Sequence, residues 1–277
     1  MKAPSKKAFA SVGIIGCGWL GTALASTLLE KGILVLVTSS KLENVHTLNQ
    51  QGINAQQLTL PTTDKLAQHD IFSQQCLVLA IPPQFKQGRV DYADKITQLV
   101  DAAKKRGIVQ RIILLSSMAI YAGLSGLVDE SSTLTLASEK AEILHQAEQA
   151  VLAFNRQKSV LRLSGLVGPN RHPGTFLQAK KALENAIGRI NLIHQQDAVG
   201  LILSLLTESS PQGVFNGVSS HHATKKAYYQ QAAKALSLPI PVFLGAESLD
   251  LSRIVSGEKA KLLLNHSFIY PDLLAWL

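Results

Sequence analysis

The chain has 277 residues, of which 46% are hydrophobic and 17% charged, and its formal net charge is +8. This composition is typical of a folded α/β protein of one large domain or two modest ones, and it excludes a disordered chain. Glycines and polar residues interrupt every apolar run before the roughly 20 residues of a membrane helix, and no basic run is interleaved with aromatic residues as in nucleic-acid-binding proteins.

The first half of the chain alternates short apolar runs, rich in β-branched residues, with longer helical patterns. The expected strands are 12–15, 33–37, 55–60, 76–81, 111–115 and 160–163, and the expected helices are 19–31, 90–106 and 138–155. Strands that are apolar throughout and separated by helices are typical of a parallel sheet covered on both faces. With right-handed crossovers, the sequence predicts an α/β, Rossmann-like, doubly wound parallel sheet.

After Gly165 the pattern loosens, and turn-rich segments such as GPNRHPG and LPIPV separate shorter elements. We therefore expect a dinucleotide-binding, Rossmann-like domain over residues 1–166. Residues 167–277 are expected to form a smaller C-terminal substrate lobe, with some of its segments returning to the sheet.

Residues 13–26, GIIGCGWLGTALAS, allow two incompatible interpretations. One is a secretory or lipoprotein leader, with lysines before an apolar run and a lipobox-like sequence that ends at Cys17. The other is a dinucleotide-binding turn, GxGxxG, between a strand and a helix. A leader would remove the first strand of the sheet, so we favour the turn. Only one other cysteine, Cys76, occurs, and so small a number favours a reduced, cytoplasmic setting.

In a dinucleotide-binding turn each glycine has its own task. Gly16 permits the tight turn, Gly18 lets the backbone approach a pyrophosphate, and Gly21 lets the helix pack close to the strand. The helix N-terminus offers amide groups and a positive dipole end to the phosphates. The expected cofactor-binding residues of this turn are Gly16, Cys17, Gly18, Trp19, Leu20 and Gly21.

The end of the second strand indicates which nicotinamide cofactor binds. A carboxylate there holds the ribose 2′-hydroxyl of NAD. This chain has Ser39, Ser40 and Lys41 at that place, and hydroxyls with a cation suit a 2′-phosphate better. We therefore expect NAD(P) as the cofactor, with a preference for NADP.

The motifs, taken in order, resemble the extended short-chain dehydrogenase/reductase superfamily, in its atypical NAD(P)-dependent epimerase/dehydratase-like branch. The stretches that carry the resemblance cover most of the chain, and they are GCGWLG, LAIPP, RIILLSSMAIY, VLRLSGLVGPNR and INLIHQQDAVG. The resemblance implies further cofactor contacts at Ala80, Ile81, Pro82, Ser116 and Gly168. It also implies a small or nucleotide-linked substrate and, by analogy with helix pairs in that family, a homodimer.

The family moves a proton with a Tyr-x-x-x-Lys pair and a serine or threonine while nicotinamide moves a hydride. Ser117 resembles the family's catalytic serine, and Tyr121 follows it at the family spacing. None of the five tyrosines has a lysine four residues later. Alignment of the helix on Glu148 puts Lys140 in the tyrosine slot, and the other register puts Leu136 there. The candidate catalytic residues are thus Ser117 and Tyr121, in an atypical site.

His194 and Asp197 form an H-x-x-D pair, but two ligands do not make a metal site. We expect His194 to end a strand and Asp197 to be the N-cap of the following helix. Two functions stay open at this point: an oxidoreductase or epimerase-like enzyme, and an NAD(P)-binding sensor or interaction protein that has lost catalysis.

Overall fold

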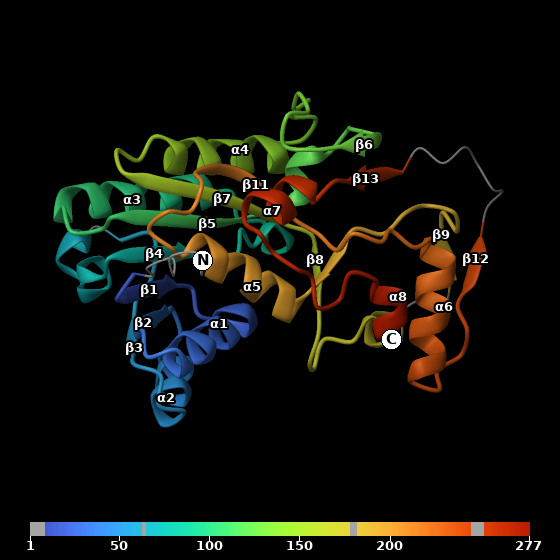
Figure 1. The fold of residues 1–277 in the computed structure, drawn as a ribbon, viewed down its shortest axis with the longest axis horizontal. Coiled ribbons are helices and arrows are strands. Elements are labelled where there is room, and N and C mark those ends of the chain that lie inside the picture. Colours follow the sequence, from blue (N-terminus) through green and yellow to red (C-terminus); the bar gives the residue numbers. More distant parts are fainter. Residues whose placement is uncertain (1–8, 63–64, 178–181, 245–251) are drawn as a thin grey trace, which may run out of the picture. The chain divides into compact units, whose positions relative to one another are not determined.

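The structure is a computed structural model that describes residues 9–62, 65–177, 182–244 and 252–277. The chain divides into two compact units (Figure 1). Unit 1 comprises residues 1–122, 136–162 and 202–215, and unit 2 comprises residues 123–135, 163–201 and 216–277. Three stretches lie on the other side of the predicted boundary at residue 166: residues 123–135 and 163–166 belong to unit 2, and residues 202–215 return to unit 1.

Unit 1 is built on a seven-stranded sheet. Its strands are β1 (Ser11–Ile15), β2 (Leu34–Ser39), β3 (Ala55–Gln57), β4 (Cys76–Leu79), β5 (Arg111–Ser117), β7 (Gln157–Leu163) and β11 (Gly213–Gly217). The order across the sheet is β11-β7-β5-β4-β1-β2-β3. β1 pairs in parallel with both β2 and β4, and β4 pairs in parallel with β5. This order reverses at β1, as in a doubly wound fold, so the predicted fold class is confirmed.

The helices that connect these strands are α1 (Trp19–Glu30), α2 (Leu42–Gln50), α3 (Tyr92–Arg106), α4 (Glu139–Leu152) and α5 (Gln195–Leu205). Figure 1 shows α3 and α4 lying together on one face of the sheet. α2 has no counterpart among the helices expected from the sequence. Only Val45 and Leu48 of this helix are buried, so its apolar stripe is too narrow to stand out from the polar residues around it.

Short 3₁₀ helices occupy several of the connections. They are η1 (Leu66–Gln68), η2 (Asp70–Ser73), η3 (Phe85–Gln87), η4 (Met118–Tyr121) and η5 (Pro173–Leu177). Within the described ranges, no helix is both long and apolar enough to cross a bilayer.

Unit 2 contains short strands in parallel pairs around a small apolar core. Its strands are β6 (Gly126–Val128), β8 (Gly165–Val167), β9 (Ala182–Glu184), β10 (Leu192–His194), β12 (Val242–Leu244) and β13 (Arg253–Val255). The pairs are β8 with β10, β9 with β12, and β6 with β13. The described part of this unit contains α6 (Lys225–Ala235), α7 (Glu258–Leu263) and α8 (Leu273–Trp276), and the first part of α5, up to residue 201, also belongs to it. One core cluster consists of Val167, Ile190, Ala223, Tyr228 and Leu273.

Candidate functional site

The glycine turn follows β1 at the carboxyl edge of the unit 1 sheet. Gly16 has a φ of 93°, and a Cβ there would lie 2.7 Å from the backbone nitrogen of Ile81. Both the positive φ and the close approach of the Ile81 backbone therefore require glycine at this position. The Cys17 amide donates to the Thr38 carbonyl at 2.8 Å, which ties the turn to the end of β2.

Gly18 is the N-cap residue of α1 and differs from Gly16 in its surroundings. A Cβ on Gly18 would meet nothing within 4 Å, so the space beside this backbone is open. No side chain caps the helix, and its first turn holds no acidic residue. The positive end of the helix dipole is thus left without a negative partner from its own first turn, as a phosphate-binding turn requires.

Gly21 lies inside α1 and faces the turn itself. Its Cβ would lie 3.5 Å from the Cys17 Sγ, the Gly16 carbonyl oxygen and the Ile14 Cγ2, which is ordinary van der Waals contact. A small residue lets α1 pack close to β1 here, but the space would accept a methyl group. Close packing of α1 on β1 therefore does not by itself require glycine at this position.

The other three residues of the turn differ in exposure. Cys17 and Leu20 are buried, and Trp19 is partly buried. Burial raises the pKa of the Cys17 thiol, against the weak effect of the Thr22 hydroxyl at 3.7 Å from its Sγ. A thiol with a raised pKa is a poor nucleophile, so Cys17 acts here as a small packing residue whose backbone amide donates to the Thr38 carbonyl.

The end of β2 lies beside the turn and exposes a hydroxyl and a cation. Thr38 and Ser39 are buried, and Ser39 Oγ accepts a hydrogen bond from the Lys41 amide at 3.3 Å. Ser40 and Lys41 are exposed. The nearest acidic residue along the chain, Glu43, lies in the first turn of α2. The side chains presented at this strand end are therefore neutral or positive.

The end of β4 forms the other wall of the turn. The Ala80 amide donates to the Ile15 carbonyl at 2.8 Å, and the Ile81 backbone lies against Gly16. Ala80 and Ile81 are partly buried, and Pro82 is exposed. These three candidate residues therefore gather with the glycine turn at one edge of the sheet.

The end of β5 carries the two candidate serines, and they have different environments. Ser116 is buried, and its hydroxyl donates to Glu148 Oε1 at 2.6 Å. Ser117 is partly buried, and its Oγ accepts a hydrogen bond from the Ala119 amide at 3.2 Å. Ser116 is thus engaged in the protein interior, whereas Ser117 retains a hydroxyl hydrogen that a ligand could accept.

Tyr121 belongs to the interior of unit 1. Its side chain is fully buried, and its hydroxyl accepts a hydrogen bond from Arg162 Nη1 at 2.8 Å. The Arg162 guanidinium also lies 4.9 Å from the centroid of the tyrosine ring. The structure thus gives this phenol a packing environment and a cationic partner, with no solvent-exposed surface.

Neither register of α4 restores the missing Tyr-x-x-x-Lys pair. Lys140 is exposed in the first turn of the helix, and Leu144, one turn later, is fully buried. In the other register Leu136 lies before the helix, with a φ of 48°. The helix therefore presents no phenol–ammonium pair at this place.

Gly168, His194 and Asp197 belong to unit 2. Gly168 closes a turn in which its carbonyl accepts from the Arg171 amide at 3.0 Å. His194 ends β10, as predicted. The N-cap prediction for Asp197 was wrong: this residue lies inside α5, and its carboxylate accepts from the Ile269 and Tyr270 amides at 2.6 and 2.9 Å. The Asp197 carboxylate thus binds a segment that is distant in the sequence, and a local sequence pattern cannot reveal such a contact. Among the described residues, no group of three or more acidic, histidine or cysteine side chains could hold a metal ion.

Sequence reasoning missed the partnership of Glu148 with Arg162. Glu148 Oε2 lies 2.7 Å from Arg162 Nη2, and both side chains are buried. Burial alone would lower the pKa of Arg162, but the hydrogen bonds and charges of Glu148 and Tyr121 raise it above its ordinary value. Each of these charged residues lies in an otherwise mostly apolar stretch of the sequence. Such a position is the sequence feature that could have indicated a buried ion pair.

Comparisons with known proteins agree with this fold. The model of the NAD dependent epimerase/dehydratase family matches residues 12–216. Protein YeeZ of Escherichia coli strain K12 is 29% identical over 267 residues, which cover 94% of this chain and 96% of that protein.

Two solved structures share the fold at low sequence identity. The Bordetella bronchiseptica enzyme WbmG, in complex with NAD and UDP, has a TM-score of 0.77 and 18% identity, over 99% of this chain and 94% of that chain. The UDP-N-acetylglucosamine 4-epimerase of Bacillus cereus has a TM-score of 0.75 and 16% identity, over 94% of both chains.

Proposed function

Since the chain belongs to the NAD dependent epimerase/dehydratase family, we propose that it binds NAD(P) at the glycine turn and acts as an oxidoreductase or epimerase-like enzyme with an atypical site. The observation that carries the proposal is the pair of Gly16 and Gly18. Gly16 is required by the positive φ of its turn and by the close approach of Ile81. Gly18 leaves open space at the N-terminus of α1, which no side chain caps.

The residues of the turn fit a dinucleotide diphosphate. Backbone amides at the start of α1 would bind the phosphates, because a helix N-terminus carries unpaired donors and a positive dipole end. Ala80, Ile81 and Pro82 would form the wall beside the cofactor. When bound, the nicotinamide ring would supply a hydride acceptor or donor.

We extend the proposal to a preference for NADP. The support is the exposed Ser40 and Lys41 at the end of β2, where an NAD-specific site carries a carboxylate. A cation and a hydroxyl would interact favourably with the 2′-phosphate of NADP, whereas they offer no carboxylate to the 2′-hydroxyl of NAD.

The substrate in this proposal is a small molecule linked to a nucleotide. Its support is that WbmG holds UDP together with NAD. Ser117 would donate its hydroxyl hydrogen to an oxygen of the substrate, because its Oγ already accepts from the Ala119 amide. Gly168 stays a proposed cofactor contact on the family resemblance alone.

A second function, an NAD(P)-binding sensor without catalysis, is favoured by one specific observation. The candidate phenol, Tyr121, is fully buried against Arg162, and α4 carries no tyrosine. A catalyst on this scaffold would need another group to move the proton, whereas a sensor would need none.

The experiment has two stages. Titration of the purified protein with NADPH and NADH, followed by nicotinamide fluorescence, tests the cofactor site: absence of binding of both at millimolar concentration would contradict the whole proposal. A screen of nucleotide-linked sugars with bound cofactor then separates the two functions. Turnover that Ser117→Ala abolishes supports the enzyme, and saturable cofactor binding without turnover of any substrate supports the sensor.

A homodimer and a cytoplasmic location complete the proposal. The homodimer rests on analogy with helix pairs in the family, and light scattering on the purified protein tests it. The location is supported by the two cysteines, Cys17 and Cys76, which are buried and unpaired. Fractionation of the host cell tests it.

A further inference from the structure

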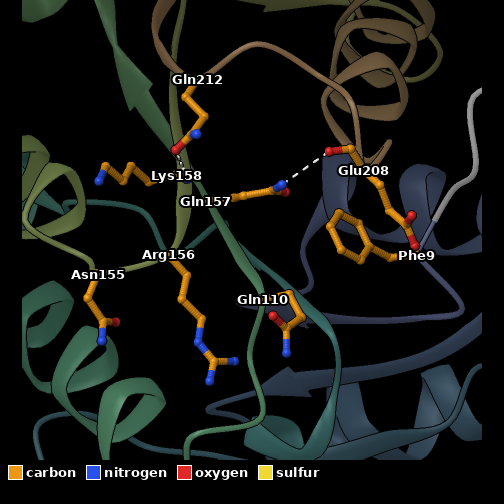
Figure 2. Close-up of a pocket in the computed structure, with 8 residues that line it drawn as sticks. All are labelled: Phe9, Gln110, Asn155, Arg156, Gln157, Lys158, Glu208 and Gln212. Carbon is orange, nitrogen blue, oxygen red and sulfur yellow. Dashed lines mark hydrogen bonds between the residues drawn. The ribbon is translucent and has the colours of Figure 1, made fainter.

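A pocket of about 680 Å³ lies in unit 1 at the amino ends of β5 and β7 (Figure 2). Gln110 directly precedes β5 and Gln157 begins β7, and the Gln157 amide donates to the Gln110 carbonyl at 3.1 Å. The glycine turn follows the carboxyl end of β1. Because the strands of the sheet are parallel, their amino ends and carboxyl ends lie on opposite sides of the sheet. This pocket is therefore separate from the proposed cofactor site.

A buried positive charge lies directly behind the pocket wall. Arg111, the first residue of β5, is fully buried, and its Nε donates to the Oε1 of the pocket-lining Gln157 at 3.0 Å. Its other two nitrogens donate to Ser159 Oγ and to the Ser210 carbonyl, at 3.4 and 2.8 Å. All three partners are neutral. A buried charge without a counter-ion is costly and projects a positive potential into the nearest polar space.

Two further cations line the pocket. Arg156 Nη1 donates to the carbonyls of Ile108 and Val109 at 3.4 and 3.1 Å, which holds the guanidinium in place. Its opposite edge, formed by Nε and Nη2, makes no hydrogen bond to the described residues, and this edge is a fork that binds two oxygens of one anion. Lys158 adds an ammonium charge, and its Nζ donates to the Phe154 carbonyl at 3.0 Å.

The remaining lining is mostly neutral and polar. Four amide side chains contribute, from Gln110, Asn155, Gln157 and Gln212, and the ring of Phe9 adds an apolar surface. Glu208 is the one carboxylate among the lining residues. With Arg111, Arg156 and Lys158 against Glu208, the positive charges around the pocket outnumber the negative ones.

We propose that this pocket binds the phosphate group of a small organic phosphate ester. The Arg156 fork would hold two phosphate oxygens, and Lys158 and the charge of Arg111 would balance the remaining negative charge. The volume is far larger than one phosphate ion and lies in the range of small-molecule pockets. The amides and Phe9 would therefore contact an organic part of the ligand.

Calorimetric titration of the full chain with glycerol 3-phosphate, inorganic phosphate and citrate tests the proposal. We expect saturable binding of the ester, weaker binding of inorganic phosphate, and loss of affinity at high salt. Arg156→Ala should weaken binding of the ester by about tenfold. Lys105→Ala, which removes the same charge from the exposed end of α3 outside the pocket, should leave it unchanged.

A second variant guards against misfolding of the first. Asn155 is exposed and makes no hydrogen bond to the described residues, so Asn155→Asp should fold normally and weaken binding by placing a negative charge in the pocket. Gly18→Val, which fills the space in front of α1, should impair binding of NADPH but not of the ester. This contrast separates failure of this site from failure of the cofactor site.

Several results would overturn the proposal. They are absence of ester binding at millimolar concentration, affinity that neither Arg156→Ala nor Asn155→Asp changes, and citrate binding more tightly than the ester. Equal affinity for the ester and inorganic phosphate would contradict the assignment of an organic part.

Discussion

Glu148 Oε2 accepts a hydrogen bond from Arg162 Nη2 at 2.7 Å, inside unit 1, with 1% and 6% of the two side chains exposed. The remaining polar atoms of this pair are also used: Ser116 donates to Glu148, and Arg162 donates to the Tyr121 hydroxyl. The network connects α4, β7 and the end of β5. It therefore fixes the backbone of Ser116, and with it the position of the adjacent candidate residue Ser117.

Loss of one partner of this ion pair should destabilise unit 1 strongly. In Arg162→Met the carboxylate of Glu148 stays buried without its counter-charge, and removal of one member of a buried pair costs about 3–5 kcal/mol. The free energy of unfolding, measured by urea denaturation followed by circular dichroism, should fall by that amount.

The double variant Glu148→Leu/Arg162→Met is the matched control. Replacement of both charges by apolar groups removes the desolvation cost as well as the attraction, so this variant should recover most of the stability lost in the single variant. An equal loss in both variants would show that packing volume, rather than the unpaired charge, sets the cost.

The glycines of the turn should differ in their tolerance of alanine. Gly16→Ala meets the Ile81 backbone at 2.7 Å and requires a positive φ, so it should lower the free energy of unfolding by more than about 2 kcal/mol. Gly21→Ala meets only ordinary contacts at 3.5 Å and should be neutral or stabilising by up to about 1 kcal/mol, because alanine favours helix. Thermal unfolding of the two variants checks this order, and equal destabilisation would contradict it.

The stability of the protein should fall in mild acid because of three histidines in unit 2, of which His194 is buried and His172 and His222 are partly buried. Burial lowers the pKa of His194, against the opposing effect of the Asp197 charge, and burial also lowers the pKa of His172 and His222. The unfolded imidazoles take up protons as the pH falls through about 6.5, whereas the folded ones resist. Stability is therefore fully present above that pH and decreases below it.

Urea midpoints measured between about pH 5 and pH 7.5 check this dependence. His194→Phe is the informative variant, because it keeps an aromatic ring beside Tyr270, whose ring centroid lies 3.9 Å from that of His194. It should flatten the dependence on pH. An unchanged slope in this variant would mean that His194 does not contribute.

The sequence predicted the parts of the fold whose signals are local. The apolar runs of β1, β4 and β5 and the glycine turn needed no knowledge of distant contacts. Partnerships across the chain could not be predicted in this way: Asp197 binds amides at Ile269 and Tyr270, more than 70 residues later. The environment of Tyr121 depends likewise on Arg162. These two residues come together only because β5 and β7 are neighbours in the folded sheet. Family spacing gave the place of Tyr121 but not its environment.

Lys41 should contribute to a preference for NADPH over NADH. It is exposed at the end of β2, so its ammonium would interact with a 2′-phosphate while still in contact with solvent. Lys41→Ala should therefore raise the Kd of NADPH by roughly threefold to tenfold and leave that of NADH unchanged. Fluorescence titration with both nucleotides measures the two dissociation constants.

Lys31→Ala, at the other end of α1, is the control. It removes the same charge and should change neither dissociation constant, which separates the local contact from the general effect of net charge. Equal affinities for NADPH and NADH in the unmodified protein would contradict the NADP preference itself.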